Sequence, residues 1–223
     1  MDNAPEEAIT SHLRKISLVS LPFEFGKVGK KGKASPTLRL GLKTKSQPRP
    51  NVNQALNPVA LALISGYTFV ARSYAYDVMH LKETIIRGVK HKGLAFIEVL
   101  QPCPTYNDIN TKAWYDGGDR LDPDTGKPRP RVYRLEEFFN PRVDSLDEEP
   151  EKMRAALTRA LELGDQIPIG VFYQNENEST FRERLYRRMP FYIERPPAKQ
   201  RISDENGISI ALMEKLLGEL KMT

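Results

Sequence analysis

Residues 57–103 read NPVALALISGYTFVARSYAYDVMHLKETIIRGVKHKGLAFIEVLQPC, and this stretch decides the fold. Asn57 before a proline is typical of a helix N-terminus, and the apolar run that follows stops at Ser65-Gly66. Residues 67–71 are β-branched and aromatic, which predicts a strand directly after the helix.

A second helix and a second strand follow in the same stretch. Asp77 can cap a helix whose apolar residues recur at helical spacing until Lys92-Gly93. Residues 94–100 are almost all apolar and predict another strand, in which Glu98 has no partner that the sequence identifies. Alternation of helix and strand with short connections predicts an α/β fold, with a mostly parallel sheet flanked by helices.

The flanking segments carry weaker signals. Residues 1–24 show a weak helical pattern, and residues 25–57 form a long loop, a feature that is usually functional in a compact domain. Turn residues mark 116–130 as a polar surface insertion, and apolar spacing predicts helices from Pro150 to Leu161 and from Ile208 to Leu220. Residues 167–173 predict a strand, placed at a sheet edge because of Pro168.

Charge is unevenly distributed. Between Phe25 and Tyr76 the chain has nine Lys or Arg residues and no Asp or Glu. Such a stretch can be a solvated loop, a diphosphate or coenzyme site, a docking surface for an acidic protein, or a nucleic-acid site. For nucleic acid, Tyr67, Phe69, Tyr74 and Tyr76 would be the stacking surfaces.

Composition excludes several classes of protein. No apolar run approaches the roughly eighteen residues of a membrane helix, and the acidic N-terminus is unlike a secretory signal, so a cytoplasmic location without membrane contact is expected. The single cysteine excludes an intrachain disulfide and any cysteine-rich zinc module.

That cysteine lies in the segment EVLQPCPTYN, residues 98–107, where a strand runs into a Pro-Cys-Pro turn. The carboxyl edge of a parallel sheet is where ligands collect, and the two prolines restrict the backbone on either side of Cys103. Iron–sulfur ligands occur in such constrained turns. A lone cysteine is nevertheless more often a buried small apolar residue, so both interpretations stay open at this point.

The run from Gly93 to Lys112, which contains QPCPTYNDINTK, closely resembles the beta subunit of 2-oxoacid:ferredoxin oxidoreductases of the archaeal two-subunit type. The resemblance spans roughly Gly32 to the C-terminus. Further stretches that carry it are ASPT (34–37), KTKS (43–46), NPVA (57–60), GYTFVAR (66–72), AYDVMHL (75–81), IPIGVFYQN (167–175) and PAKQ (197–200).

The resemblance implies an incomplete thiamine-diphosphate-binding fold with a long C-terminal extension. Residues 1–33 would be a divergent N-terminal segment and basic loop. Residues 34–112 would be the C-terminal part of the thiamine-diphosphate-binding domain, and residues 113–223 the C-terminal extension of the beta subunit. The match would correspond to the C-terminal two-thirds of that subunit.

The same resemblance implies site residues. Cys103 falls on one of the four thiolates that hold a [4Fe–4S] cluster, and Lys31 falls on a lysine near the substrate. Four further positions would bind cofactor: Ser35, Thr37, Thr105 and Asn107. The family's other three cysteines, two of them in a Cys-Pro-Gly-Cys-Gly motif, and its Gly-Asp-Gly-Asp motif for Mg²⁺ and diphosphate do not occur in this chain.

The implied activity is oxidative decarboxylation of a 2-oxoacid such as pyruvate or 2-oxoglutarate to acyl-CoA and CO₂, with electrons passed through the cluster to ferredoxin. The implied partners are an alpha subunit, ferredoxin, the 2-oxoacid and coenzyme A. With most ligands missing, the chain alone is expected to be inactive and to hold neither iron nor thiamine diphosphate. The alternatives are a non-catalytic remnant that pairs with the alpha subunit, or a basic module that binds an acidic partner or nucleic acid.

Overall fold

The computed structural model describes residues 16–22, 37–45, 49–103, 107–195, 197–199 and 201–208. The chain divides into two compact units, Met1–Ser179 and Thr180–Thr223, and each is described by itself. Within the described ranges, no helix has the length and apolar character needed to cross a bilayer.

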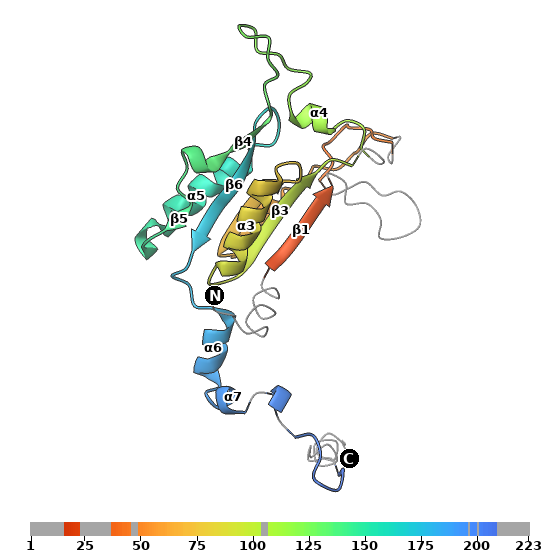
Figure 1. Cartoon of the computed structure of the whole chain (residues 1–223). Coiled ribbons are helices and arrows are strands. Elements are labelled where there is room, and N and C mark those ends of the chain that lie inside the picture. Colours follow the sequence, from red (N-terminus) through yellow and green to blue (C-terminus); the bar gives the residue numbers. More distant parts are fainter. Residues whose placement is uncertain are drawn as a thin grey trace. The chain divides into compact units, whose positions relative to one another are not determined.

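The first unit is built on a six-stranded sheet with the order β1-β3-β2-β6-β4, in which β5 also pairs with β6 (Figure 1). All pairings are parallel except that between β2 and β6. The predicted mostly parallel sheet is therefore confirmed. The strands are β1 (Ile16–Pro22), β2 (Phe69–Tyr74), β3 (Ala95–Gln101), β4 (Val132–Arg134), β5 (Arg142–Val143) and β6 (Ile167–Asn175).

Two helices, α2 and α3, begin where the sequence predicts them, whereas the helix predicted from Ile208 to Leu220 lies outside the described residues except for Ile208. Asn57 caps α2 by accepting a hydrogen bond from the backbone N–H of Ala60 at 3.0 Å, and Asp77 caps α3 by accepting one from that of His80 at 3.2 Å. The helices of the first unit are α2 (Pro58–Ile64), α3 (Val78–Lys90), α4 (Lys112–Tyr115) and α5 (Glu149–Ala160), with 3₁₀ turns η1 (Leu135–Glu137) and η2 (Leu146–Glu148). The second unit contains α6 (Phe181–Arg188), α7 (Phe191–Glu194) and η3 (Pro197–Lys199).

Helices cover both faces of the sheet. Val59 of α2 and Ala156 of α5 share one apolar cluster with Phe96 of β3. The next residue of β3, Ile97, belongs to a second cluster, against which Leu81 of α3 packs. Because neighbouring strand residues point to opposite faces, α2 and α5 lie on one side of the sheet and α3 on the other.

Two predictions about strands are wrong. Residues 16–22 were expected within a weakly helical segment, but they form β1, which pairs in parallel with β3 from Ile16↔Ala95 onward. Pairing with a neighbouring strand outweighs a weak local preference. The strand with Pro168 was expected at an edge, but β6 lies inside the sheet. The pairing of β6 with β2 ends at Gly170. Pro168, which has no N–H to donate, therefore lies outside that pairing and breaks none of its hydrogen bonds.

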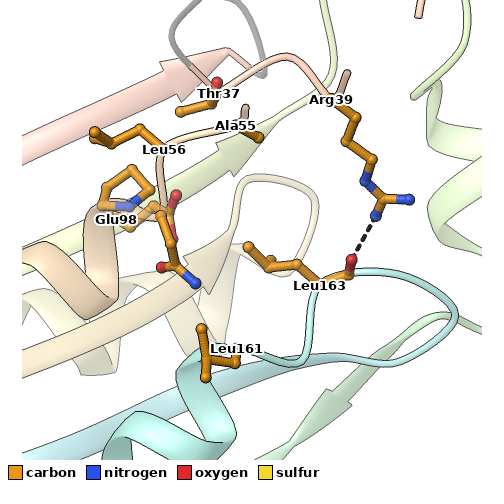
Figure 2. A pocket seen from close by; sticks show the side chains of 9 residues that line it. Thr37, Arg39, Ala55, Leu56, Glu98, Leu161 and Leu163 are labelled. Atoms are coloured by element: carbon orange, nitrogen blue, oxygen red, sulfur yellow. Dashed lines mark hydrogen bonds between the residues drawn. The ribbon is translucent and has the colours of Figure 1, made fainter. Parts of the chain in front are cut away.

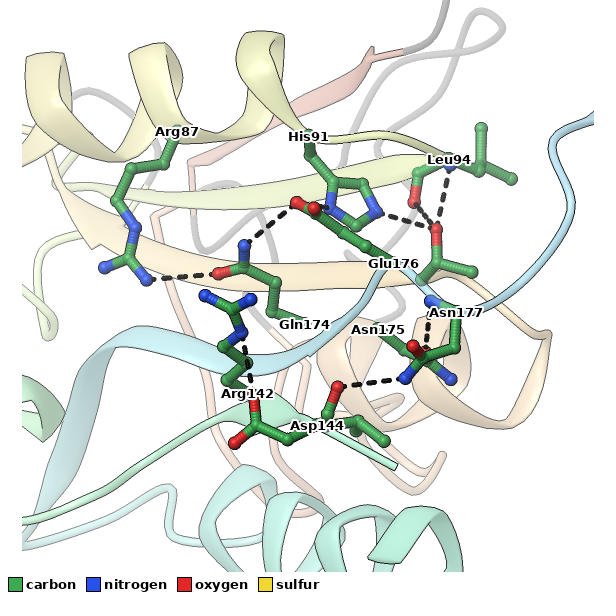
Figure 3. A network of polar contacts seen from close by, with 11 residues as sticks. Arg87, His91, Leu94, Arg142, Asp144, Gln174, Asn175, Glu176 and Asn177 are labelled. Carbon is green, nitrogen blue, oxygen red and sulfur yellow. Dashed lines mark hydrogen bonds and ion pairs between the residues drawn. The ribbon is translucent and has the colours of Figure 1, made fainter. Parts of the chain in front are cut away.

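Polar contacts join α3 to the segments around β6 (Figure 3). Arg87 donates to Gln174 at 3.3 Å, and the buried ring of His91 contacts Glu176 at 3.4 Å. At the other end of the helix, the ring of His80 lies 3.4 Å from the carboxylate of Glu136 in η1. These contacts join α3, and His91 directly after it, to segments that lie far away in the sequence.

We expect Glu136→Gln to destabilise the chain at neutral pH. Burial opposes ionisation of Glu136, but hydrogen bonds from His80 and the backbone and the charge of Arg87 outweigh it and lower the pKa of this carboxyl. A lowered folded-state pKa contributes stability that is present above the unfolded value of 4.5 and is lost as pH falls through the folded value.

Denaturant unfolding at pH 7 and at pH 3 measures this contribution. The difference in midpoint between wild type and Glu136→Gln should shrink at the lower pH. The neighbouring Glu137→Gln, which changes an exposed carboxyl of the same 3₁₀ turn, is the control and should match wild type at both values. If the midpoints of wild type and Glu136→Gln differ equally at both pH values, the stabilising effect of a lowered Glu136 pKa is contradicted.

Candidate functional site

Cys103 lies two residues beyond the carboxyl end of β3, next to the parallel strand β2. Its thiol is free and its side chain is half-buried. The carbonyl of Cys103 accepts a hydrogen bond from the backbone N–H of Asn107 at 2.8 Å, which closes a turn at these two residues. The thiol is therefore held at the sheet edge where open α/β proteins bind ligands.

Asn107 stabilises this turn. Its side chain is buried, and its Oδ1 accepts from the backbone N–H groups of Ile109 and Asn110, both at 2.9 Å. Its Nδ2 donates to Oδ1 of Asn110 at 3.1 Å. These bonds give Asn107 a role in holding the backbone of residues 107–110, and its predicted contact with cofactor stays a prediction.

An aromatic cluster joins the end of β2 to α4. The rings of Tyr74, at the end of β2, and Tyr115, in α4, have centroids 5.1 Å apart, and Trp114 meets Tyr115 edge-on at 4.9 Å. Burial, the largest cause, raises the pKa of both tyrosines well above the usual range. Both phenols therefore stay protonated near neutrality and do not serve as bases.

A pocket of about 260 Å³ opens against the middle of β3 (Figure 2). Its walls come from the segment before α2, from the start of α2, from β3 and from the residues after α5. They are Thr37, Arg39, Ala55, Leu56, Asn57, Pro58, Glu98, Leu161 and Leu163. The lining is mostly apolar with a few polar groups, which is the usual make-up of a small-molecule site.

Glu98 in this pocket is half of a buried ion pair. Its Oε2 accepts from Nε of Arg72 at 2.5 Å, and the two side chains are 5% and 0% exposed. Arg72 also donates to the carbonyl of Pro168 at 3.3 Å. The pair is neutral as a whole, whereas Arg39 adds a cation at the rim, where it donates to the carbonyl of Leu163 at 2.6 Å. The charged groups around the pocket therefore carry a net positive charge, which favours an anionic ligand.

The structure places the predicted site residues in two locations. Thr37 is buried and lines the pocket, whereas Cys103 and Asn107 form the turn beyond β3. Lys31, Ser35 and Thr105 lie outside the described residues.

Sequence reasoning counted Arg39 and Arg72 among the nine basic residues of the acid-free stretch, but it did not predict that Arg72 pairs with Glu98 or that Arg39 stands at this pocket. A cation directly after the apolar residues Phe69–Ala71 of the strand was the available signal for Arg72.

The tyrosines that would stack on nucleic acid are mostly not available. Phe69 and Tyr74 are buried, Tyr67 is half-buried, and Tyr76 is exposed. Stacking needs free ring faces, so this arrangement does not favour a nucleic-acid module.

A complete four-iron cluster does not fit the residues of this chain. Such clusters take four thiolates, and the 223 residues contain one cysteine. In the part of the chain that the structure describes, no group of three or more His, Cys, Asp or Glu side chains could hold a metal ion. A four-iron cluster would need three further thiolates from other protein segments.

Comparison with known proteins gives a consistent result. The family described as the C-terminal part of the pyruvate ferredoxin oxidoreductase beta subunit matches residues 129–188. The chain is 48% identical over 218 residues to the 2-oxoacid:ferredoxin oxidoreductase subunit beta of Saccharolobus solfataricus, which covers 96% of this chain and 67% of that protein. It is 49% identical over 183 residues to 2-oxoacid:ferredoxin oxidoreductase 1, subunit beta, of Aeropyrum pernix, covering 81% of this chain and 54% of that protein.

A solved structure has a similar fold. It is a 2-oxoglutarate:ferredoxin oxidoreductase from Magnetococcus marinus with 2-oxoglutarate, coenzyme A and succinyl-CoA bound. The TM-score is 0.61 and the identity 20%, over 98% of this chain and 63% of that one. The chain spans about two-thirds or less of the length of the curated relatives it matches.

Proposed function

Because the chain belongs to the family of 2-oxoacid:ferredoxin oxidoreductase beta subunits, we propose that it acts within an enzyme that oxidatively decarboxylates a 2-oxoacid to acyl-CoA and CO₂ and passes the electrons to ferredoxin. The observation that carries the proposal is the 48% identity to a relative of that name along 96% of this chain. The partners would be an alpha subunit, ferredoxin, coenzyme A and the 2-oxoacid, and the location cytoplasmic.

Cys103 would be one ligand of the [4Fe–4S] cluster in the assembled enzyme. Its position supports this role, because a half-buried thiol held by the Asn107 turn is placed before any cluster arrives. Thiamine diphosphate and Mg²⁺, bound in the complete site, would supply the electron sink for decarboxylation. Lys31, Ser35, Thr37, Thr105 and Asn107 remain proposed contacts around that site.

The acid-free segment supports binding of anions. Lys43, Lys45 and Arg49 are exposed, and Arg39 stands at the rim of the pocket. Carboxylate and phosphate groups of a 2-oxoacid and coenzyme A are the anions that such an enzyme must attract. Cations on an exposed segment raise the local concentration of these ligands.

The isolated chain should bind no four-iron cluster. After anaerobic incubation with iron and sulfide and removal of the excess, we expect iron far below the roughly four atoms per chain of a complete cluster, because one thiolate cannot hold it. Iron analysis and the visible absorption of the cluster measure this. Close to four iron atoms per chain would show that the ligand count is wrong.

A chimera tests the function itself. The N-terminal part of a family member that contains the Cys-Pro-Gly-Cys-Gly motif is placed ahead of residue 34 of this chain and expressed with the alpha subunit of that family member. We expect ferredoxin reduction that depends on a 2-oxoacid and coenzyme A. Cys103→Ala should abolish it, whereas Val52→Ala, at an exposed position, should not. A chimera that holds its cluster but reduces no ferredoxin with any 2-oxoacid would sink the proposal.

A further inference from the structure

The pocket against β3 has an arginine without an acidic partner. Arg39 is half-buried at the rim and donates from one nitrogen to the carbonyl of Leu163 at 2.6 Å. None of the ion pairs among the described residues includes Arg39. A guanidinium carries several N–H donors in a fork that matches a carboxylate. Arg39 can therefore pair with a negatively charged group in the pocket.

The other charge in the pocket wall is already compensated. Figure 2 shows Glu98 and Arg39 on opposite sides of the pocket. The Glu98 carboxylate accepts from Nε of Arg72 at 2.5 Å, and both side chains are buried. This pair leaves the single positive charge of Arg39 to be matched, which favours a ligand with one negative charge. A second anionic group at the far side would meet the carboxylate of Glu98 and be repelled.

The remaining walls of the pocket are mainly apolar. They include Ala55, Leu56, Pro58, Leu161 and Leu163. Leu56 is 46% exposed and Leu161 is 69% exposed, so a ligand could cover apolar surface here. Polar oxygens placed against such walls would lose hydrogen bonds to water, whereas hydrocarbon would gain from burial. The body of the ligand should therefore be a hydrocarbon chain.

The size and the construction of the pocket suit a small ligand. Its volume of about 260 Å³ lies just below the usual range of roughly 300–1,000 Å³ for drug-sized ligands. Two hydrogen bonds join its walls: that from Arg39 to Leu163, and one from Nδ2 of Asn57 to the carbonyl of Ala160 at 2.6 Å. Walls that are already connected need less reordering when a ligand binds.

We propose that this pocket binds a short aliphatic monocarboxylate, with the carboxylate on Arg39 and the hydrocarbon chain along Leu56, Leu161 and Leu163. The proposal does not depend on the proposed function, because it follows from the charge and the lining of the pocket. Simple fatty acids and 2-oxoacids with an aliphatic side chain share this chemistry, and the test below separates them.

A titration of the full chain with acetate, butanoate and hexanoate tests the proposal. Methyl NMR spectra of leucine-labelled protein should show saturable shifts at Leu56, Leu161 and Leu163, and none at the exposed Leu121 and Leu146 outside the pocket. Kd should fall about 4-fold for each added CH₂, which is the factor that corresponds to about 0.8 kcal/mol per buried CH₂. A Kd that is independent of chain length would show that the apolar walls do not contact the ligand.

Variants locate the two ends of the ligand. Arg39→Gln should raise the Kd for hexanoate about 10-fold or more, as expected for the loss of a charged hydrogen bond. The control Arg142→Gln removes an exposed arginine outside the pocket and should change Kd less than about 2-fold. Leu161→Ser should weaken hexanoate binding several-fold, whereas the control Leu146→Ser, at a similarly exposed leucine, should not.

The remaining comparisons decide the class of ligand. The proposal is overturned if glutarate or inorganic phosphate binds as tightly as hexanoate, if Arg39→Gln leaves Kd unchanged, or if hexanoate does not bind. It is supported if 2-oxohexanoate and hexanoate bind equally, which identifies aliphatic acids in general. It is also supported if 2-oxohexanoate binds at least about 10-fold more tightly, which identifies 2-oxoacids. None of these results decides the ferredoxin-reduction assay of the chimera, so the two proposals fail separately.

Discussion

Arg72→Leu is expected to lower the free energy of unfolding by about 3–5 kcal/mol, the usual cost of leaving a buried charge without its partner. Arg72 is fully buried in β2 and donates to Glu98 on the neighbouring strand β3 at 2.5 Å. Without the guanidinium, the Glu98 carboxylate would stay in an apolar surrounding or take up a proton. Either outcome destabilises the folded chain at neutral pH.

Urea unfolding at pH 7 measures the loss, and two variants serve as controls. Arg72→Leu/Glu98→Leu removes both charges and should recover most of the lost stability, since well-packed apolar residues can replace a buried ion pair. Arg87→Leu, which removes a half-exposed arginine of α3, should cost less than about 1 kcal/mol. If Arg72→Leu costs no more than Arg87→Leu, the charge of Glu98 is not held by Arg72.

Gly117→Ala is expected to open the base of the hairpin formed by residues 117–130. Gly117 has a φ of +77°, and an added Cβ would lie 1.9 Å from the carbonyl oxygen of Arg129. The backbone cannot accommodate this contact, so the cost should exceed the roughly 1–3 kcal/mol of a strained conformation alone and be limited by the free energy of opening the hairpin. Arg131 would then lose its position over the ring of Trp114.

Hydrogen exchange at the Arg129 and Arg131 amides measures this opening, because those N–H groups donate to the carbonyls of Arg120 and Tyr115. Gly126→Ala is the matched control. It lies in the same hairpin at a φ of +65°, but an added Cβ meets no atom within 4 Å, so only the strain of about 1–2 kcal/mol should appear. Equal protection in the two variants would show that the contact at Gly117 is relieved elsewhere.

Local sequence signals were enough to predict the helices and strands around the candidate site. Asn57 and Asp77 accept the hydrogen bonds that their positions predicted, and the helix after Asn57 ends at Ser65 and Gly66. Caps, breakers and periodicity act within a few residues, so one stretch of sequence contains all the information that they need. For the same reason, the residues around Cys103 suffice to place it at the carboxyl end of a strand.

The pairing of strands within the sheet could not be predicted from such local signals. The strand β1 gains its partner from residues about eighty positions later, and the strand with Pro168 was expected at an edge but lies inside the sheet. Strand preference depends on which neighbours a strand finds, and those neighbours are set by the topology of the whole sheet.

The sequence alone determined the family, the alternation of helices and strands, and the turn that carries Cys103, because each depends on residues close together in the chain. Only the tertiary structure decided that Arg72 neutralises Glu98, 26 residues later, and that Thr37 and Arg39 meet residues after α5 around one pocket. The register of β2 and β3 places Arg72 opposite Glu98. A buried charge takes whichever partner the packed sheet brings within reach, and that choice exists only once distant segments are in contact.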